Sequence, residues 1–194
     1  MPSLFNIPWP SSGMMKAMGH IHTKPGQHDH TISGFIIRTD GDEPKVLLHK
    51  HKKLGKLLQF GGHIELNEDP WQAVCHEILE ESGYSMDQLK IMQPKTRIKY
   101  SAVHTKRHPY PVNYNTHKFN DEHFHIDISY AFITDEEPSY AIAEDESEDM
   151  MLLSRQQVIE LTEKETYEDV KQICLFIFDE VLSKWEPVDT AEYN

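Results

Sequence analysis

One short segment fixes the position of a helix more firmly than any other part of the chain. Asp69 is a good N-cap residue, Pro70 suits the first helical position, and Gln72 stands at capping-box spacing from Asp69. Gly83 stands where a left-handed residue ends many helices. The sequence therefore predicts a helix that begins after Asp69 and ends before Gly83.

The predicted helix carries two different faces. Apolar side chains at helical spacing form one stripe, which is expected to face a core: Trp71, Val74, Cys75, Ile78 and Leu79. Glu77, Glu80 and Glu81 are spaced i, i+3 and i+4, so they share a second face. Three adjacent carboxylates repel one another, and a hard divalent cation such as Mg²⁺ would relieve that repulsion. A solvated acidic surface is the alternative interpretation.

The helix and the glycine turn before it resemble the Nudix box. Gly62, five residues, Glu68, seven residues and then His76 to Tyr84 (HEILEESGY) follow that family's pattern G-x5-E-x7-R-E-U-x-E-E-x-G-U, with U a bulky apolar residue. His76 departs from the pattern, because the family has arginine there. Tyr84 fits the last apolar position loosely.

The resemblance implies a metal-dependent hydrolase that cleaves a diphosphate linkage in a nucleoside diphosphate linked to another moiety. Glu77, Glu80 and Glu81 would be the catalytic residues. Together with Gly61 they would hold Mg²⁺ or Mn²⁺, which neutralises phosphoryl oxygens and activates water. Glu77 would be a metal ligand or would help to deprotonate the attacking water.

Several residues are expected to support this site. Gly62 lets the backbone approach a ligand closely, and Glu65 and Glu68 would shape the loop or hold outer-shell waters. Some family members use a further glutamate from a late loop, and Glu146 is the first choice here over Glu144 and Glu148. In the family the arginine orients box glutamates. His76 has an ordinary pKa near about 6.5, so we expect weaker, pH-sensitive support, with a decayed active site as the alternative.

Residues near the box or in the long loop over 104–122 are candidates for substrate contacts: His51, His63, His123, His125, Arg107, Tyr110 and Tyr114. The histidines could contact phosphate or metal, since His123 and His125 alternate to one face of a predicted strand. The tyrosines could stack on a base. Ordinary polar strand positions and loop packing are the competing interpretations.

Composition narrows the class of partner. The net charge is −13, with 19 Lys plus Arg against 32 Asp plus Glu. A general binder of nucleic-acid backbones needs basic surface, so we expect no bulk nucleic acid as partner. The resemblance implies a small nucleotide-type substrate. Cys75 and Cys174 lie in apolar helical patterns and indicate buried thiols in a reducing compartment. No apolar run approaches membrane-spanning length, which favours a cytoplasmic protein without a membrane partner.

The order of predicted elements gives the fold class. Predicted strands precede and follow the box helix, and predicted helices over 154–161 and 167–185 end the chain. This order predicts an α/β fold with a mixed β-sheet and helices on both faces. The resemblance makes it a Nudix-type α/β/α sandwich. We expect a partly irregular N-terminal extension over 1–29, the Nudix domain over 30–186 and a C-terminal tail over 187–194.

Two other functions compete with hydrolysis. A catalytically weakened Nudix-fold protein that binds nucleotides or regulates is the first, because of His76. An isomerase like the Nudix-fold isopentenyl diphosphate isomerases is the second, but it needs a cysteine in the site, and neither Cys75 nor Cys174 is predicted to face it. Family members often dimerise, so the resemblance leaves a homodimer open.

Overall fold

The computed structural model describes residues 28–98, 104–118 and 124–194. The expected N-terminal extension therefore lies outside the described residues except for His28 and Asp29. His123 and most of a strand predicted over 97–103 also lie outside them.

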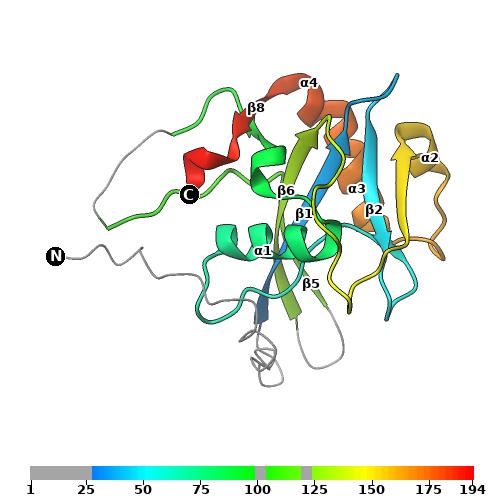
Figure 1. The fold of residues 1–194 in the computed structure, drawn as a ribbon, viewed down its shortest axis with the longest axis horizontal. Coiled ribbons are helices and arrows are strands. Elements are labelled where there is room, and N and C mark those ends of the chain that lie inside the picture. The colour runs from blue at the N-terminus through cyan, green and yellow to red at the C-terminus, as the bar shows by residue number, and fades with distance from the viewer. Residues whose placement is uncertain (1–27, 99–103, 119–123) are drawn as a thin grey trace.

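A mixed sheet forms the middle of the molecule (Figure 1). Within the described residues it has eight strands, with main order β3-β2-β1-β6-β4-β8, while β5 pairs with β6 and β7 pairs with β2. β1 and β6 run parallel, and the other pairs run antiparallel. The strands are β1 (His28–Arg38), β2 (Lys45–Lys50), β3 (Leu57–Leu58), β4 (Lys90–Pro94), β5 (Asn113–Lys118), β6 (Phe124–Thr134), β7 (Met150–Ser154) and β8 (Trp185–Asp189).

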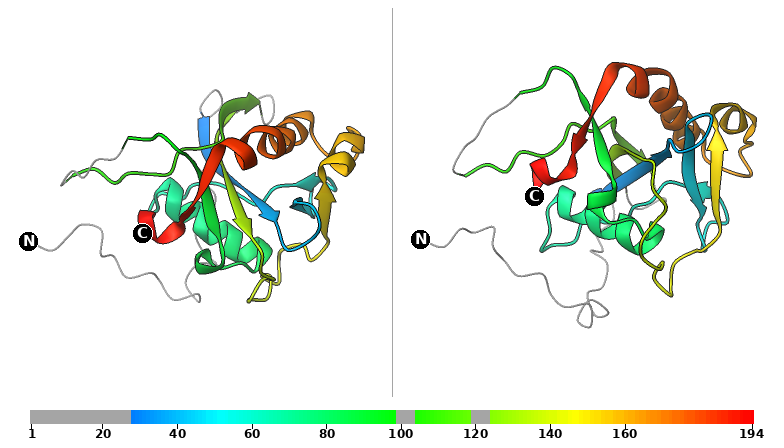
Figure 2. Two further views of the ribbon diagram at one scale, coloured as in Figure 1. Left: turned by 90° about the horizontal axis from the view of Figure 1, so that it is seen from above. Right: turned by 45° about the horizontal axis from the view of Figure 1, so that its top comes forward.

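Helices cover both faces of the sheet, as Figures 1 and 2 show. One face carries α1 and the other carries α3, and this arrangement confirms the predicted α/β/α sandwich. Among the described residues, no helix has both the length and the apolar character required to cross a bilayer. The helical segments are α1 (Pro70–Ser82), η2 (Met86–Gln88), α2 (Arg155–Glu160), α3 (Glu168–Phe176), the π-helical η3 (Ile177–Val181), α4 (Leu182–Lys184) and η4 (Thr190–Tyr193).

The two faces of β1 feed two separate hydrophobic cores. Ile32 and Ile36 pack in the core that contains Trp71 of α1. Phe35 and Ile37 pack in the core that contains α3. Successive side chains of a strand point to opposite faces, so even-numbered residues of β1 face α1 and odd-numbered residues face away from it. This alternation decides on which face each polar side chain near the start of β1 must lie.

Three segments differ from the expectations drawn from sequence. The loop predicted over 104–122 contains β5, an edge strand whose side chains alternate between half-buried and exposed. The segment after Gly83 contains β4, which the sequence pattern did not reveal. Residues 187–194, expected to be a tail, continue the fold, because β8 pairs with β4 and the Tyr193 hydroxyl donates to Gln93 Oε1 at 3.0 Å.

Candidate active site

The predicted caps of α1 are present. Asp69 Oδ1 accepts hydrogen bonds from the backbone N–H groups of Trp71 and Gln72 at 2.9 and 3.0 Å. Gln72 Oε1 in turn accepts from the Asp69 N–H, which completes the capping box. Gly83 has φ 72° and donates to the Leu79 carbonyl at 3.1 Å. These bonds fix both ends of the helix that carries the glutamates.

The glycine pair lets the turn touch both β1 and α1. Gly61 has φ 148°, and a Cβ there would overlap the carbonyl oxygen of Ile32. A Cβ on Gly62 would overlap the carboxylate of Glu77. The Gly61 N–H donates to Glu81 Oε2 at 2.7 Å. Glu77 and Glu81 are therefore held against the turn, and a side chain at Gly62 would displace the Glu77 carboxylate.

Burial gives two of the glutamates unusual proton affinity. Glu81 is only 6% exposed, and burial raises its pKa to about 9, although the Gly61 N–H acts the other way. Burial also raises the pKa of Glu77 to about 7, with the charges of Glu80 and Glu68 adding to the shift and His76 opposing it. Glu80 stands at the exposed end of the group, with 46% of its side chain accessible.

The loop over 135–149 brings a fourth carboxylate to this group. The Tyr140 N–H donates to the Gly83 carbonyl, and the Ala143 N–H donates to the Glu80 carbonyl, at 3.0 and 2.9 Å. These bonds align the loop with the end of α1. The charge of Glu146 contributes to the raised pKa of both Glu77 and Glu81. Glu146 thus lies within electrostatic range of the buried glutamates.

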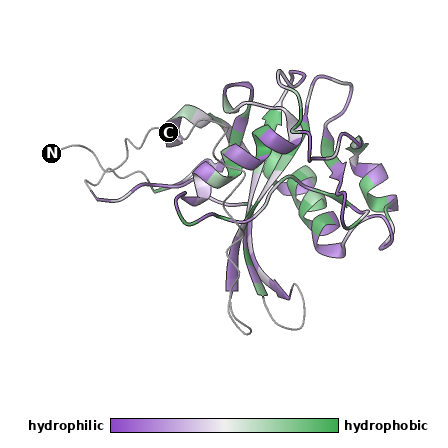
Figure 3. Ribbon diagram, turned by 60° about the horizontal axis from the view of Figure 1, so that its bottom comes forward, coloured by the Kyte–Doolittle hydropathy of each residue, from purple (hydrophilic) through white to green (hydrophobic). Residues whose placement is uncertain are grey.

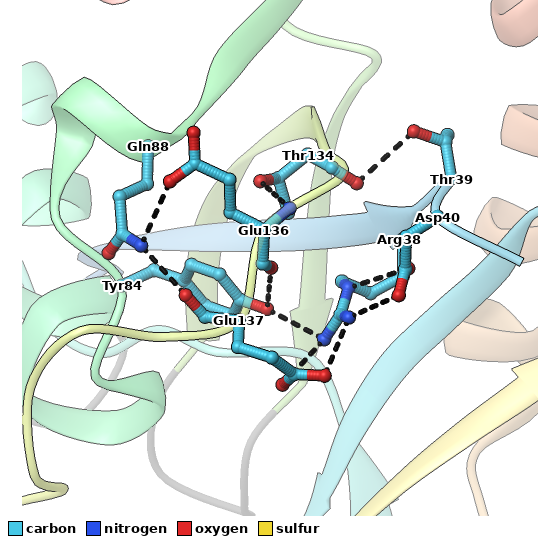
Figure 4. A network of polar contacts seen from close by, with 8 residues as sticks. All are labelled: Arg38, Thr39, Asp40, Tyr84, Gln88, Thr134, Glu136 and Glu137. Carbon is cyan, nitrogen blue, oxygen red and sulfur yellow. Dashed lines mark hydrogen bonds and ion pairs between the residues drawn. The ribbon is translucent and has the colours of Figure 1, made fainter.

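A buried arginine network anchors the same loop (Figure 4). Arg38 forms paired hydrogen bonds with Asp40 and with Glu137, and it donates to the Tyr84 hydroxyl oxygen at 3.1 Å. The Tyr84 hydroxyl donates to the Glu136 carbonyl at 2.8 Å. Tyr84 therefore fits a position typical of apolar residues because its ring is buried while its hydroxyl is satisfied.

His76 touches two of the acidic side chains. Its Nε2 lies 3.1 Å from Glu80 Oε1, and its Nδ1 lies 3.7 Å from Glu68 Oε2. The interaction with Glu68 raises the pKa of His76 most, the charges of Glu80 and Glu77 add to it, and the pKa reaches about 9 despite burial. His76 is accordingly charged at neutral pH. It loses its charge at a higher pH than the value of about 6.5 expected from sequence. Glu68 Oε1 also accepts from the Glu65 N–H at 2.9 Å, which closes the loop before α1.

The donor set suits a hard divalent cation. Glu77 and Glu81 hold their carboxylates against the glycine turn, where desolvation raises both pKa values and the charge of Glu77 adds to the rise at Glu81. Mg²⁺ and Mn²⁺ prefer oxygen ligands and would compensate this buried charge. The residues present therefore fit such an ion.

Comparison with known proteins agrees with this geometry. The model of the NUDIX domain family matches residues 28–176, which is most of the chain. The chain belongs to the Nudix family. Proteins of this family generally use divalent metal ions.

Individual relatives of this Nudix domain are distant. A hydrolase of the NUDIX family from Clostridium perfringens has 26% identity and a TM-score of 0.61, covering 79% of this chain and 97% of that one. The NUDIX domain of Shewanella oneidensis NrtR, solved with ADP ribose, has 13% identity and a TM-score of 0.55, covering 77% and 86%. A Caenorhabditis elegans protein named putative nudix hydrolase 1 is 33% identical over 67 residues, which span 33% of this chain and 18% of that protein. The first and third of these relatives carry hydrolase names, whereas the likeness to NrtR, at 13% identity, supports the fold alone.

The histidines expected to meet the substrate are spread over different places in the Nudix domain. His51 Nδ1 accepts from the N–H groups of Lys53 and Leu54 at 3.2 and 3.4 Å, so His51 stabilises a turn. His63 and His125 lie together, with ring centroids 5.1 Å apart. Both belong to the face of the sheet opposite α1, because His125 is opposite the odd-numbered Asp29 in register. His123 lies outside the described residues.

The loop residues expected to meet the substrate have contacts of their own. Arg107 lies over the Tyr193 ring, 5.2 Å from its centroid. The Tyr110 hydroxyl accepts from the Ile98 N–H, and its backbone is bonded to Gln93. Tyr114 is 66% exposed on β5 and is available for stacking. These contacts give Arg107 and Tyr110 structural partners, so their roles toward a substrate stay predictions.

The two thiols face cores. Cys174 is fully buried beneath α3, and Cys75 packs against the core under α1. Burial raises the pKa of each thiol to about 12, far from that of a reactive thiolate. The structure therefore lends no support to the isomerase alternative.

Two buried aspartates, Asp29 and Asp127, are not indicated by any motif in the sequence. Asp127 on β6 accepts hydrogen bonds from the hydroxyls of Thr31, Ser33 and Ser129 at 3.0, 2.9 and 2.7 Å. Asp29 lies opposite His125. The signal was the alternation of polar and apolar residues in both strands, which places these side chains on one face, but pairing β1 with β6 requires the structure.

Proposed function

We propose that the protein is a metal-dependent hydrolase that cleaves a diphosphate linkage in a nucleoside diphosphate linked to another moiety. The observation that carries this proposal is the pair of carboxylates held against the Gly61–Gly62 turn, with Glu81 buried, Glu77 half-buried and Glu80 at the open end. A rigid capped helix is a suitable platform for such ligands, because their positions then depend on few side-chain torsions. Glu77, Glu80, Glu81 and Gly61 are the proposed ligands of Mg²⁺ or Mn²⁺.

A bound divalent ion would neutralise phosphoryl oxygens and activate water. The protein's own groups have separate tasks. The Gly61 N–H orients the Glu81 carboxylate, and protonated His76 orients Glu80 and Glu68 through its two ring nitrogens. Glu77, which lies against Gly62 at the turn, is proposed either to hold the ion or to take a proton from the attacking water. Glu146, Glu65 and Glu68 are the remaining acidic residues around the proposed metal site.

The substrate is proposed to be a small nucleotide-type molecule. Support comes from the ADP ribose bound by a structural neighbour and from the acidic surface of this chain, which disfavours long nucleic acids. The free thiols of Cys75 and Cys174 support the proposed cytoplasmic location. A homodimer remains a prediction from family resemblance.

The test is a panel of nucleoside diphosphate sugars, dinucleoside polyphosphates and ADP ribose, with Mg²⁺ or Mn²⁺. We expect turnover that EDTA abolishes and that Glu80→Gln or Glu81→Gln lowers at least about 100-fold, since a metal centre supplies several kcal/mol of transition-state stabilisation. Glu163→Gln, on an exposed residue, is the matched control and should retain activity. Absence of turnover on every compound, with ligand binding retained, would instead identify the weakened nucleotide-binding protein.

The position of His76 bears on that alternative. His76 makes the contacts that an orienting residue needs, with ring nitrogens 3.1 Å from Glu80 Oε1 and 3.7 Å from Glu68 Oε2. We therefore favour the hydrolase over the regulatory protein.

A further inference from the structure

We propose that Asp29, His63 and His125, named here the His–Asp cluster, form a second metal site that takes Zn²⁺. One carboxylate oxygen and one nitrogen from each imidazole lie within 4.8 Å of one another. This set is distinct from the glutamates of α1 in position and in chemistry. The proposal concerns metal binding alone and does not depend on hydrolase activity.

Three separate segments bring the His–Asp cluster together. β1 and β6 are parallel, and Asp29 lies opposite His125 in their register. On the other side of β1, His63 forms a bridge with Thr31. Gly62 faces the carboxylate of Glu77, whereas the next residue, His63, contacts His125 and Asp29 on the opposite face. The backbone at these two residues thus separates the two sites.

The distances are close to those of a bound ion. Around a tetrahedral zinc with bonds of about 2.1 Å, ligand atoms stand about 3.4 Å apart. His63 Nε2 and Asp29 Oδ2 are already 3.9 Å apart. The widest separation in the cluster is no more than 4.8 Å, so an approach of about 1.4 Å or less suffices. Small rotations about side-chain torsions provide a movement of this size.

Burial of the His–Asp cluster favours the binding of a cation. Asp29 is 4% exposed and His125 is 7% exposed, so a carboxylate and an imidazole stand largely out of water. A cavity of about 290 Å³ is lined by Asp29, His63 and Glu65, among others, and provides access for an ion. Figure 3 shows that the central strands project here beyond the helices and are largely hydrophilic.

A neighbouring histidine offers outer support. His117 on β5 lies opposite His125, with ring centroids 5.3 Å apart. Its Nδ1 lies 3.1 Å from Asn115 Oδ1, and this contact holds the His117 ring in place beside His125. Such outer partners fix the orientation of metal-binding histidines in many proteins.

The donor atoms select the metal. Two imidazole nitrogens and one carboxylate oxygen match the three protein ligands of open zinc sites, which leave a fourth position for water. Mg²⁺ prefers oxygen donors and would favour the glutamates instead. The two sites should therefore be occupied independently when Zn²⁺ is added in the presence of excess Mg²⁺.

The experiment measures zinc binding to the full chain carrying Glu80→Gln and Glu81→Gln, after removal of metals, in millimolar Mg²⁺. Equilibrium dialysis gives the stoichiometry and affinity, and Co²⁺ added in place of Zn²⁺ gives a visible absorption band for nitrogen and oxygen ligation. We expect one bound Zn²⁺. Because the loss of an outer partner already costs about 10- to 100-fold in metal affinity, His63→Gln and Asp29→Asn should each weaken binding at least about 100-fold.

Two controls make the result decisive. His108→Gln removes another half-buried histidine, whose Nδ1 lies 4.0 Å from Asp69 Oδ1 but which belongs to no metal-ligand cluster among the described residues, and should leave zinc affinity unchanged. The double variant His20→Gln with His22→Gln removes two histidines that lie close together in the sequence before the described residues, and it should also leave zinc affinity unchanged. Asp29→Asn preserves shape and tests the site even where His63→Gln perturbs folding. Zinc binding that is absent, or that survives both cluster variants, overturns the proposal, as does binding that the His20 and His22 variant removes.

Discussion

The glutamate site and the His–Asp cluster occupy opposite faces of one sheet, beside the same turn, but they are built differently. The glutamate site takes its side chains mainly from one capped helix and its glycine turn, within residues 61–81. The cluster takes one residue each from β1, the turn and β6. Thr31 and Asp127, the next polar pair along the same strands, are 96 residues apart in sequence. A site whose residues are close together in the sequence can be recognised there as a motif. A site whose residues are brought together by strand pairing cannot.

The largest expected effects concern Gly61 and Gly62, whose replacement tests whether the two sites are independent. Gly61→Ala puts a side chain in the left-handed region and against the rigid Ile32 carbonyl, so we expect the free energy of unfolding to fall by about 3 kcal/mol. Gly62→Ala meets only the end of the Glu77 side chain, which can rotate away, so stability should change by less than about 1 kcal/mol. Urea unfolding of both variants measures the difference.

Gly62→Ala should nevertheless damage hydrolysis, because Glu77 must leave its place. We expect turnover to fall at least about 100-fold while zinc affinity at the His–Asp cluster stays within about threefold of wild type. Full activity in Gly62→Ala would show that the position of Glu77 against the turn is unimportant. Loss of both functions together would show that the two sites are not separable.

The charge of His76 should make the stability of the protein depend on pH. The pKa of His76 is raised to about 9 by Glu68 and Glu80, so the folded protein binds a proton that the unfolded chain loses near pH 6.5. Its stabilisation is fully present below about pH 6.5 and is lost as pH rises toward 9. Without metal, His76→Arg should reduce this decline by an amount on the order of 2 kcal/mol.

Denaturant unfolding at pH 6 and pH 9 provides the measurement for His76→Arg. His104→Gln, on an exposed histidine, should keep the wild-type decline. If the arginine variant loses stability with pH as steeply as the wild type, His76 is not charged through its contacts with Glu68 and Glu80. Its assignment as the orienting residue would then be wrong.

The smallest expected effect concerns the polar network beside the cluster. Asp127→Asn replaces one oxygen that accepts hydroxyl hydrogen bonds by an amide that donates, and should lower stability by about 1–2 kcal/mol. Thermal unfolding measures it, with the exposed Asp145→Asn as control. Since the network lies on the face opposite α1, hydrolysis should stay within about twofold of wild type. A much larger loss of turnover would mean that this face takes part in the reaction.

What could be predicted from sequence follows the same division. The caps at Asp69 and Gly83 depend on residues a few positions away, and both are present as expected. The strand β5 was missed because its segment is polar and holds two prolines, and its structure comes from pairing with β6. The sequence predicts a tail at the end of the chain, whereas β8 pairs there with β4, a partner about a hundred residues earlier that no local pattern indicates.

In the candidate site too, the sequence predicts which residues lie together but not how buried or charged each of them is. Spacing placed Glu77, Glu80 and Glu81 on one face, but it could not show that Glu81 is buried while Glu80 is exposed. That difference comes from the Gly61 N–H and from the loop over 135–149, which packs along the end of α1. The charge of His76 likewise depends on two acidic side chains whose approach only the fold determines.

The parallel pairing of β1 with β6 also has a consequence for how the chain folds during synthesis. β1 is an inner strand of the finished sheet, yet the partner on one of its sides ends only at Thr134. Until that residue has left the ribosome, one long edge of an apolar strand remains unpaired, a situation that favours aggregation and slow folding. α1, which is made early and packs on β1, is the element available to shield its neighbouring face during that interval.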